Sequence, residues 1–172
     1  MEDKFIIFNG MVCSNYLNRM KDYAIRDLEN ETRKGKTNFT KFSKAAEKIY
    51  NDNKIECLKF LYSELEKIAD GNRMMFSLPF SGCEELLKVC PDSFSGLRLP
   101  VLRREDQIIF FLKEDEDEKN GELKKELKAV LVKINEICGA LKKEIEIYNR
   151  ELADMLRKKS QELYEEMSAR VN

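Results

Sequence analysis

Among the side chains that could do chemistry, the thiol of Cys83 has the best-defined surroundings. It follows Ser81-Gly82 and precedes Glu84, a spacing typical of a capping box at the start of a short helix. A thiol in the first turn of a helix meets the positive end of the helix dipole and ionises more easily. The neighbouring Glu84 and Glu85 oppose a thiolate, and no histidine is present to act as its base. We therefore interpret Cys83 as a small apolar residue beneath the helix, and an enzyme with a thiol or carboxylate site is the third hypothesis.

The absence of histidine narrows the chemistry of the whole chain. Histidine is the usual general base near neutral pH, the usual partner of a serine or cysteine nucleophile and the commonest zinc ligand. Most carboxylates fall on charged helix faces or in the acidic run at 114–118, where mutual repulsion favours a solvated loop. That run lacks the spaced oxygen ligands and central glycine of a calcium loop. The sequence predicts no catalytic residue, no metal site and no cofactor.

A basic run is the remaining candidate for ligand binding. Its residues occupy a polar connection and then one face of the following predicted helix, at three- and four-residue spacing. They are Arg33, Lys34, Lys36, Lys41, Lys44 and Lys48. Such a face could hold phosphates, although most basic helix faces are only solvated. Phe39 and Phe42 beside it are spaced like core residues rather than base-stacking platforms. A nucleic-acid or ribonucleoprotein-associated factor is therefore the alternative function.

Composition limits the class of protein. The chain has 172 residues, 42% hydrophobic and 37% charged, which suits one domain or a small domain with an extension. Its 31 basic and 32 acidic residues balance, so no global field draws it to nucleic acid or to a membrane. The apolar run at 5–8 is too short for a secretory signal or a membrane span. Five cysteines without a Cys-x-x-Cys pair indicate reduced thiols. We expect a cytoplasmic protein, with the nucleus as the alternative.

Hydrophobic periodicity supplies the elements. Apolar spacing predicts helices over 14–32, 39–50 and 55–68, after a strand or a late-starting helix at the amino terminus. Short extended pieces follow around Pro79 and Pro100, each proline favouring an edge strand, and 107–112 is the best strand candidate. The predicted fold class is mainly α, a helical bundle with a small β element in the middle, around 76–112.

The last third of the chain predicts one long amphipathic helix. Residues 121–172 contain no proline and carry an apolar seam at alternating four- and three-residue steps. The seam is Leu123, Leu127, Val130, Ile134, Ile137, Leu141, Ile145, Tyr148, Leu152 and Met155. One extra four-residue step after Leu141, with Gly139 beside it, makes a bend plausible there. Roughly fifty residues at about 1.5 Å each would exceed the diameter of a compact domain of this size.

These patterns divide the chain into a helical domain at 1–113, an acidic loop at 114–121 and the long helix at 122–172. We expect 122–148 to pack against the helices of residues 14–70, because this half has the wider apolar arc. The narrower stripe of 149–172 is expected to project toward one partner helix. The residues predicted to bind the partner are Tyr148, Leu152, Met155, Leu156, Leu163 and Met167. The alternative is an intramolecular bundle in which the helix bends at Gly139 and folds back.

The function predicted from these features is non-catalytic. The chain is expected to be an intracellular helical adaptor or structural subunit that binds a partner protein, or a second copy of itself, through the carboxy-terminal helix. No membrane is expected among its partners.

Overall fold

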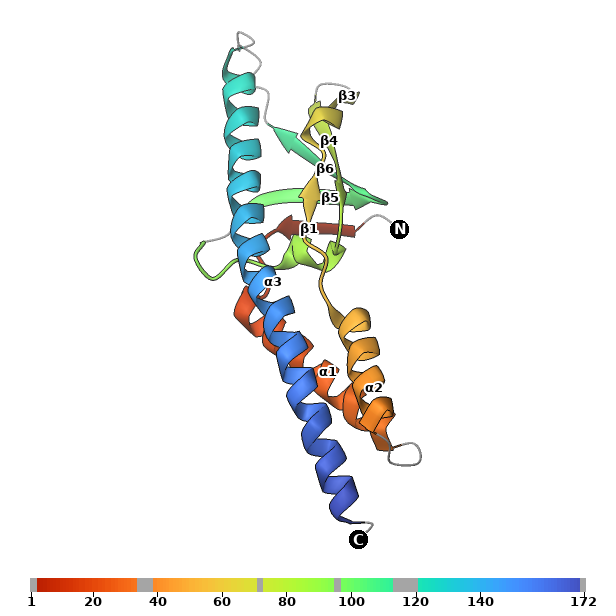
Figure 1. Ribbon diagram of the computed structural model, residues 1–172. Coiled ribbons are helices and arrows are strands. Elements are labelled where there is room, and N and C mark those ends of the chain that lie inside the picture. Colours follow the sequence, from red (N-terminus) through yellow and green to blue (C-terminus); the bar gives the residue numbers. More distant parts are fainter. Residues whose placement is uncertain (1–2, 34–38, 71–72, 95–96, 113–120, 171–172) are drawn as a thin grey trace. The chain divides into compact units, whose positions relative to one another are not determined.

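The computed structural model describes residues 3–33, 39–70, 73–94, 97–112 and 121–170. Within these ranges it contains three α-helices, two 3-10 helices and an antiparallel sheet of six strands (Figure 1). In chain order the elements are β1 (Asp3–Ile7), α1 (Cys13–Arg33), α2 (Phe39–Asn53), β2 (Lys59–Phe60), η1 (Tyr62–Glu64), β3 (Glu66–Asp70), β4 (Arg73–Ser81), η2 (Glu84–Lys88), β5 (Leu99–Arg104), β6 (Gln107–Leu112) and α3 (Gly121–Ala169). The prediction of a mainly α bundle is therefore wrong, because six strands, β1 near the amino terminus and five between residues 59 and 112, form one antiparallel sheet.

The chain forms two compact units. Unit 1 comprises Met1–Cys13 and Glu56–Lys143, and so contains the sheet and the first part of α3. Unit 2 comprises Ser14–Ile55 and Glu144–Asn172, and so contains α1, α2 and the second part of α3. Each unit is assembled from segments distant in sequence.

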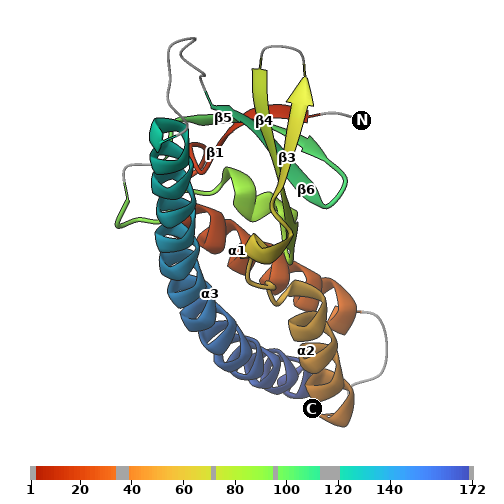
Figure 2. The ribbon, with the colours of Figure 1, turned by 90° about the horizontal axis from the view of Figure 1, so that it is seen from above.

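The sheet of unit 1 has the strand order β1-β5-β6-β4-β2, and β3 also pairs with β4. Figure 2 shows β3 beside β4. Cross-strand pairs place one set of alternating side chains on a common face, and most of the apolar members of this set are buried. Its members include Ile7, Phe76, Leu78, Phe80, Leu99, Val101, Ile108, Phe110 and Leu112. We call this the inner face. Phe76 and Phe110 stack on it with ring centroids 5.7 Å apart.

Contacts from η2 identify what covers part of the inner face. Asp3 and Arg103, both in inner-face register, form ion pairs with Lys88 and Glu84 of η2, the first at 2.7 Å. The buried Leu86 adds the apolar part of this cover. The two charge pairs and the buried leucine together hold η2 against the β1–β5 side of the sheet.

Residues 55–68 do not form the predicted third helix. Their apolar spacing suits a helix, yet Phe60 pairs with Phe80, and β3 runs antiparallel to the first half of β4. Tertiary pairing decides the outcome here, because strand pairing with β4 stabilises an extended chain more than its local periodicity stabilises a helix.

The two strand prolines lie inside the sheet rather than on edge strands, contrary to the prediction. The carbonyl of Pro79 accepts the N–H of Leu61. The backbone N–H that proline lacks would point to the same side, where β3 and β2 pair with β4. The β3 ladder ends at Ser77 and the β2 ladder begins at Phe80, which leaves Pro79 between them. Pro100 lies one residue before the β5–β6 ladder begins. Both positions tolerate the loss of an N–H.

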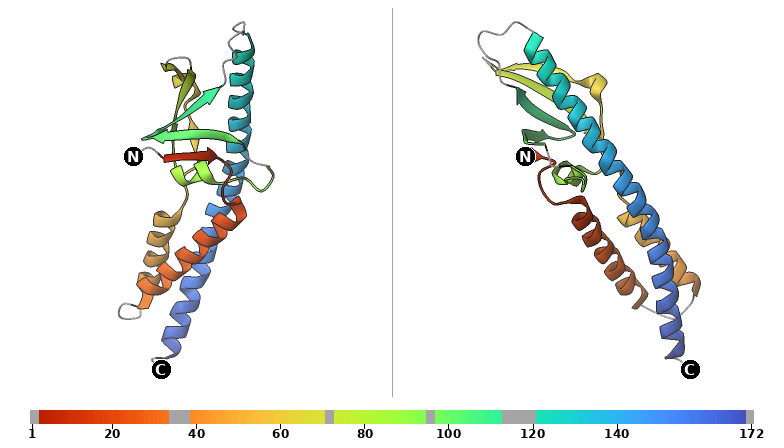
Figure 3. Two further views of the ribbon diagram at one scale, coloured as in Figure 1. Left: turned by 180° about the vertical axis from the view of Figure 1, so that it is seen from behind. Right: turned by 90° about the vertical axis from the view of Figure 1, so that its left-hand side faces the viewer.

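Unit 2 is a three-helix unit of α1, α2 and the second part of α3 (Figure 3). The predicted helices at 14–32 and 39–50 are confirmed as α1 and α2. The buried side chains come from all three helices at helical spacing. They include Leu17, Ala24, Leu28, Phe42, Ala46, Ile49, Ile145, Tyr148, Leu152 and Leu156.

Helix α3 is continuous from Gly121 to Ala169, so the long helix predicted from the seam is confirmed. Gly139 does not interrupt it, and a β-carbon added there would meet no atom within 4 Å. Ile134, Ile137 and Leu141 are buried in the part that belongs to unit 1. The first part of α3 therefore belongs with the sheet, contrary to the prediction that it packs on the helices of residues 14–70. The acidic run at 114–118 lies outside the described residues.

Candidate protein-binding surface

The partner-binding residues predicted on α3 divide into two sets. Tyr148, Leu152 and Leu156 are 1%, 0% and 1% exposed, so they belong to the core of unit 2. Met155, Leu163 and Met167 are half-buried. The segment 149–172 therefore does not project as predicted. It packs with α1 and α2, because the buried set is enclosed within unit 2. Only the half-buried set retains a surface that another molecule could contact.

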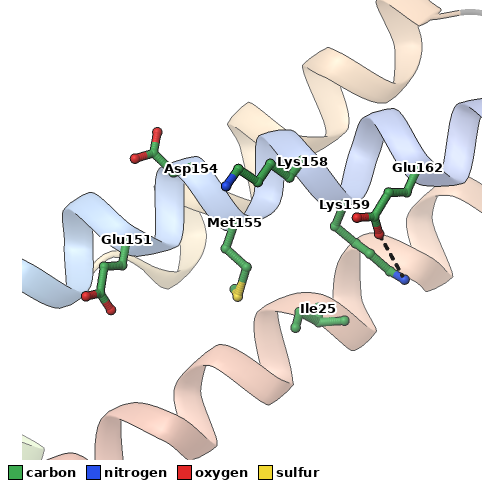
Figure 4. A pocket seen from close by; sticks show the side chains of 7 residues that line it. All are labelled: Ile25, Glu151, Asp154, Met155, Lys158, Lys159 and Glu162. Atoms are coloured by element: carbon green, nitrogen blue, oxygen red, sulfur yellow. Dashed lines mark ion pairs between the residues drawn. The ribbon is translucent and has the colours of Figure 1, made fainter.

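Met155 lines a groove between α1 and α3. In Figure 4 its side chain extends from α3 toward Ile25 of α1, and these two apolar side chains lie between charged residues of α3. The groove has a volume of about 430 Å³. Its remaining lining residues are Glu151, Asp154, Lys158, Lys159 and Glu162. An apolar strip with charged margins is the surface that an amphipathic helix recognises.

Ion pairs between α1 and α3 order the margins of this groove. The ammonium of Lys21 lies 2.6 Å from the carboxylate of Glu151, and the hydrogen bond between them lowers the pKa of that carboxyl. Lys159 lies 3.8 Å from Glu29 of α1 and 3.8 Å from Glu162. These pairs are partly solvated, so they position side chains more than they stabilise the unit.

A second contact fixes α3 against the end of α2, and the sequence reasoning missed it. The side chain of Asn149 accepts the N–H of Ile55 and donates to its carbonyl, both at 2.9 Å. The hydroxyl of Tyr148 donates to the carbonyl of Asn53 at 3.3 Å, and burial raises the pKa of Tyr148 to about 12. In the sequence, the signal for this contact is Asn149 itself, which carries an amide side chain at the point where the apolar seam of α3 narrows.

The groove between α2 and α3 has a different character. Phe39 is 48% exposed at one end and packs edge-to-face on Tyr164, with ring centroids 5.4 Å apart. Small and polar residues such as Ser43 and Ser160 line it, with Arg157 beside them. The interpretation of Phe42 as core agrees with its 1% exposure, whereas Phe39 is a surface aromatic.

The basic residues at 33–48 are brought together only in part. Arg33, Lys41, Lys44 and Lys48 are exposed, while Lys34 and Lys36 lie outside the described residues. Lys48 lies 3.9 Å from Glu31 of α1, which offsets some of the positive charge of this face. Binding of nucleic acid by these residues stays a prediction.

The thiols show no arrangement suited to catalysis in the part of the chain that the structure describes. Cys83 is half-buried at the start of η2, a five-residue 3-10 helix, without the side-chain cap that the sequence predicts. Cys138 of α3 lies in an apolar environment, and burial raises its pKa to about 12. A thiol with a raised pKa is a poor nucleophile at neutral pH. No cluster of three or more metal-ligating side chains occurs among the described residues.

None of the described helices has both the length and the apolar character needed to cross a bilayer. Comparison with known proteins adds no relative: no family model matches this chain, and neither the curated proteins nor the solved structures gave a significant match.

Proposed function

We propose that the chain is a non-catalytic, intracellular protein-binding subunit that holds an amphipathic helix of a partner protein in the groove between α1 and α3. The observation that carries this proposal is the pair Ile25 and Met155, half-buried side by side between charged margins. The five free thiols are consistent with a reducing compartment.

The shape and chemistry of the groove favour a helix as the occupant. The groove between α1 and α3 is a surface into which the side chains of a third helix can pack at three- and four-residue spacing. Methionine adapts to differently shaped apolar partners, which suits Met155 to such a contact. The margins of the groove carry charges of both signs, with Lys158 and Asp154 next to each other in Figure 4. A partner helix that carries both acidic and basic residues would pair with them.

Site-specific photo-crosslinking tests the proposal. A photoreactive residue at Met155 should capture a partner in cells that express the chain naturally. The same residue at Ile147, which is 52% exposed elsewhere on α3, is the matched control. A Met155→Lys variant should weaken binding of the captured partner by about tenfold or more, because a charge would enter the apolar strip.

The control variant Ile147→Lys should leave binding within about twofold of the original. Circular dichroism must show that both variants keep the helices. Equal capture from the two positions, or full binding by Met155→Lys, would contradict the proposal.

Nucleic-acid binding is the second candidate, and the exposure of Phe39 near the basic face of α2 favours it. Reversing the charges of Lys41, Lys44 and Lys48 should abolish binding to mixed nucleic acid at low salt. Affinity of the original chain should fall steeply as salt rises, because each neutralised phosphate releases counterions. Absence of binding at low salt would exclude this candidate.

A further inference from the structure

The groove between α1 and α3 is built from contacts that repeat every fourth residue on both helices. An ion pair joins the two helices at each end, and two apolar side chains lie between these ion pairs (Figure 4). Residue numbers rise together along both helices, so α1 and α3 run parallel here. Four residues of a helix span about 6 Å, which is the spacing of the contacts. We call these contacts rungs, and in order they are Lys21–Glu151, Ile25–Met155 and Glu29–Lys159.

The two ion-pair rungs limit where the groove accepts an apolar group. Lys21, Glu29 and Lys159 keep only 25 to 30% of their side-chain surface exposed, so little water remains around these charges. An apolar side chain laid over such a pair would remove that water without offering a hydrogen bond in return, which is unfavourable. The groove therefore favours an apolar group at the central rung and a polar group at each end.

The charge that the groove leaves uncompensated is positive. Each carboxylate of the lining has a cation within 4 Å, and Lys159 pairs with Glu29. Lys158 is exposed three residues after Met155, and among the described residues it is the only charged residue of the lining without an ion pair. A carboxylate on the partner, one helical turn from the group that contacts Met155, would pair with this ammonium.

From this arrangement we infer that the partner helix enters the groove with a single large apolar residue, which we call the anchor. Polar residues one turn before and one turn after the anchor face the ion-pair rungs, and an acidic residue one turn from it faces Lys158. A helix with a continuous apolar stripe is disfavoured, because its other apolar residues would cover the ion pairs. This inference rests on the function proposed above and adds the chemistry of the partner.

Selection from a peptide library tests this chemistry. The probe is a helical peptide of about twenty residues displayed on phage, with a central position and the positions three and four residues on either side of it randomised. Peptides are selected on the full chain and counter-selected on Met155→Lys, so that those bound in the groove remain. Leucine should be enriched at the centre, and polar residues should exceed leucine by about fivefold or more at the positions that face the ion pairs. Leucine and glutamine have similar helix propensities, so this preference reports contact rather than helix formation.

Replacing an ion-pair rung by an apolar one should change the selected sequences. Lys21→Leu combined with Glu151→Leu creates a second apolar rung, so leucine should rise by about fivefold or more at the position one turn from the anchor. Glu29→Leu combined with Lys159→Leu makes the same change at the other end, and it replaces the first variant if circular dichroism shows that the first loses its helices.

The matched control changes an ion pair that lies outside the groove. Lys48 of α2 and Glu31 of α1 lie 3.9 Å apart. Lys48→Leu combined with Glu31→Leu also replaces a lysine and a glutamate by leucine, and it should leave the selected sequences unchanged.

Charge reversal at Lys158 tests the acidic residue of the partner. Peptides selected on the original chain should carry an acidic residue one turn from the anchor, about threefold or more above a basic one. Lys158→Glu should reverse this preference, because it reverses the uncompensated charge of the groove. Lys44→Glu makes the same change of charge at an exposed position of α2, and it should leave the preference as it is.

Three results would overturn the inference and leave the proposed function in place. The first is selection of leucine at every randomised position on the original chain. The second is a set of selected sequences that neither rung replacement changes. The third is an acidic preference that Lys158→Glu does not reverse. If no selected peptide depended on Met155, the proposed function and this inference would both be overturned.

Discussion

Units 1 and 2 differ in how completely their elements bury their own apolar surface. In unit 2 each helix has one apolar stripe, and three helices enclose their stripes together, which leaves shallow grooves such as the one at Ile25 and Met155. In unit 1 the inner face of the sheet is largely buried, and on the opposite face the central Ser77 and Ile109 are also buried, at 2% and 6% exposed. Away from that centre, Ile6 and Phe111 of the same face are each 43% exposed. A sheet therefore needs a second layer on each apolar side, whereas a helix needs neighbours along one stripe.

Core truncation in each unit should give the largest effects. Phe110→Ala in unit 1 and Leu152→Ala in unit 2 remove fully buried side chains, and each should destabilise by about 3 to 5 kcal/mol. Hydrogen exchange should accelerate mainly in β4 and β6 for the first variant and mainly in α1 and α2 for the second.

Phe111→Ala and Ile147→Ala change exposed residues of β6 and α3 and are the controls, and each should change stability by less than about 1 kcal/mol. Uniform acceleration of exchange in both core variants would show that the two units open as one, and would remove the distinction between them.

Alkaline pH should weaken unit 2 through Tyr148. Burial raises its pKa to about 12, above the value near 10 of an unfolded tyrosine. The folded state keeps the proton that the unfolded state releases, so this contribution is intact below pH 10 and is lost between pH 10 and 12. The original chain should lose about 2 to 3 kcal/mol more than Tyr148→Phe over that interval, measured by urea unfolding.

Tyr62 of η1, in unit 1, also has a pKa raised to about 12 by burial. Tyr62→Phe should therefore reduce the alkaline loss recorded by exchange in unit 1 but not in unit 2. An identical alkaline loss in the original chain and in both variants would contradict the assigned pKa shifts.

Loss of the two hydrogen bonds between the Asn149 side chain and the backbone of Ile55 should have an intermediate effect on stability. Asn149→Ala leaves the N–H and carbonyl of the buried Ile55 without their partners, and this should cost about 1 to 3 kcal/mol. Asn149→Asp should recover only part, because a carboxylate accepts the N–H but cannot donate to the carbonyl. Asn135→Ala, at an exposed position of α3, is the control. An equal loss of stability in this variant would contradict a specific role for the hydrogen bonds of Asn149.

The smallest expected effect is stabilising. Gly139 is exposed within α3, and a β-carbon there would meet no neighbour within 4 Å. Gly139→Ala should raise stability by about 0.5 to 1 kcal/mol, because alanine restricts the unfolded chain and favours the helix. Thermal unfolding would register this as a higher midpoint. A lower midpoint would indicate a contact that depends on the glycine.

The sequence predicted correctly those elements whose own pattern of apolar residues specifies their structure. The helices α1, α2 and α3 and the strand β6 follow from local patterns of apolar residues. It failed at 55–68, where pairing with β4 replaces a helical pattern by strands, and at Pro79, whose missing donor falls between two ladders. Of the residues predicted to bind a partner, Met155 keeps an accessible surface while Leu152 is core, and partner binding itself stays a prediction.

The sequence by itself determined the helical segments, the single long α3 and the lack of histidine chemistry, because composition and helical periodicity are properties of the chain alone. Only the tertiary structure decided which apolar side chains are covered. Burial depends on the neighbours that distant segments supply, as Ile55 does for Asn149 and β4 does for β3. A pattern of residues shows that a surface must be buried, and only the fold shows which element, if any, covers it.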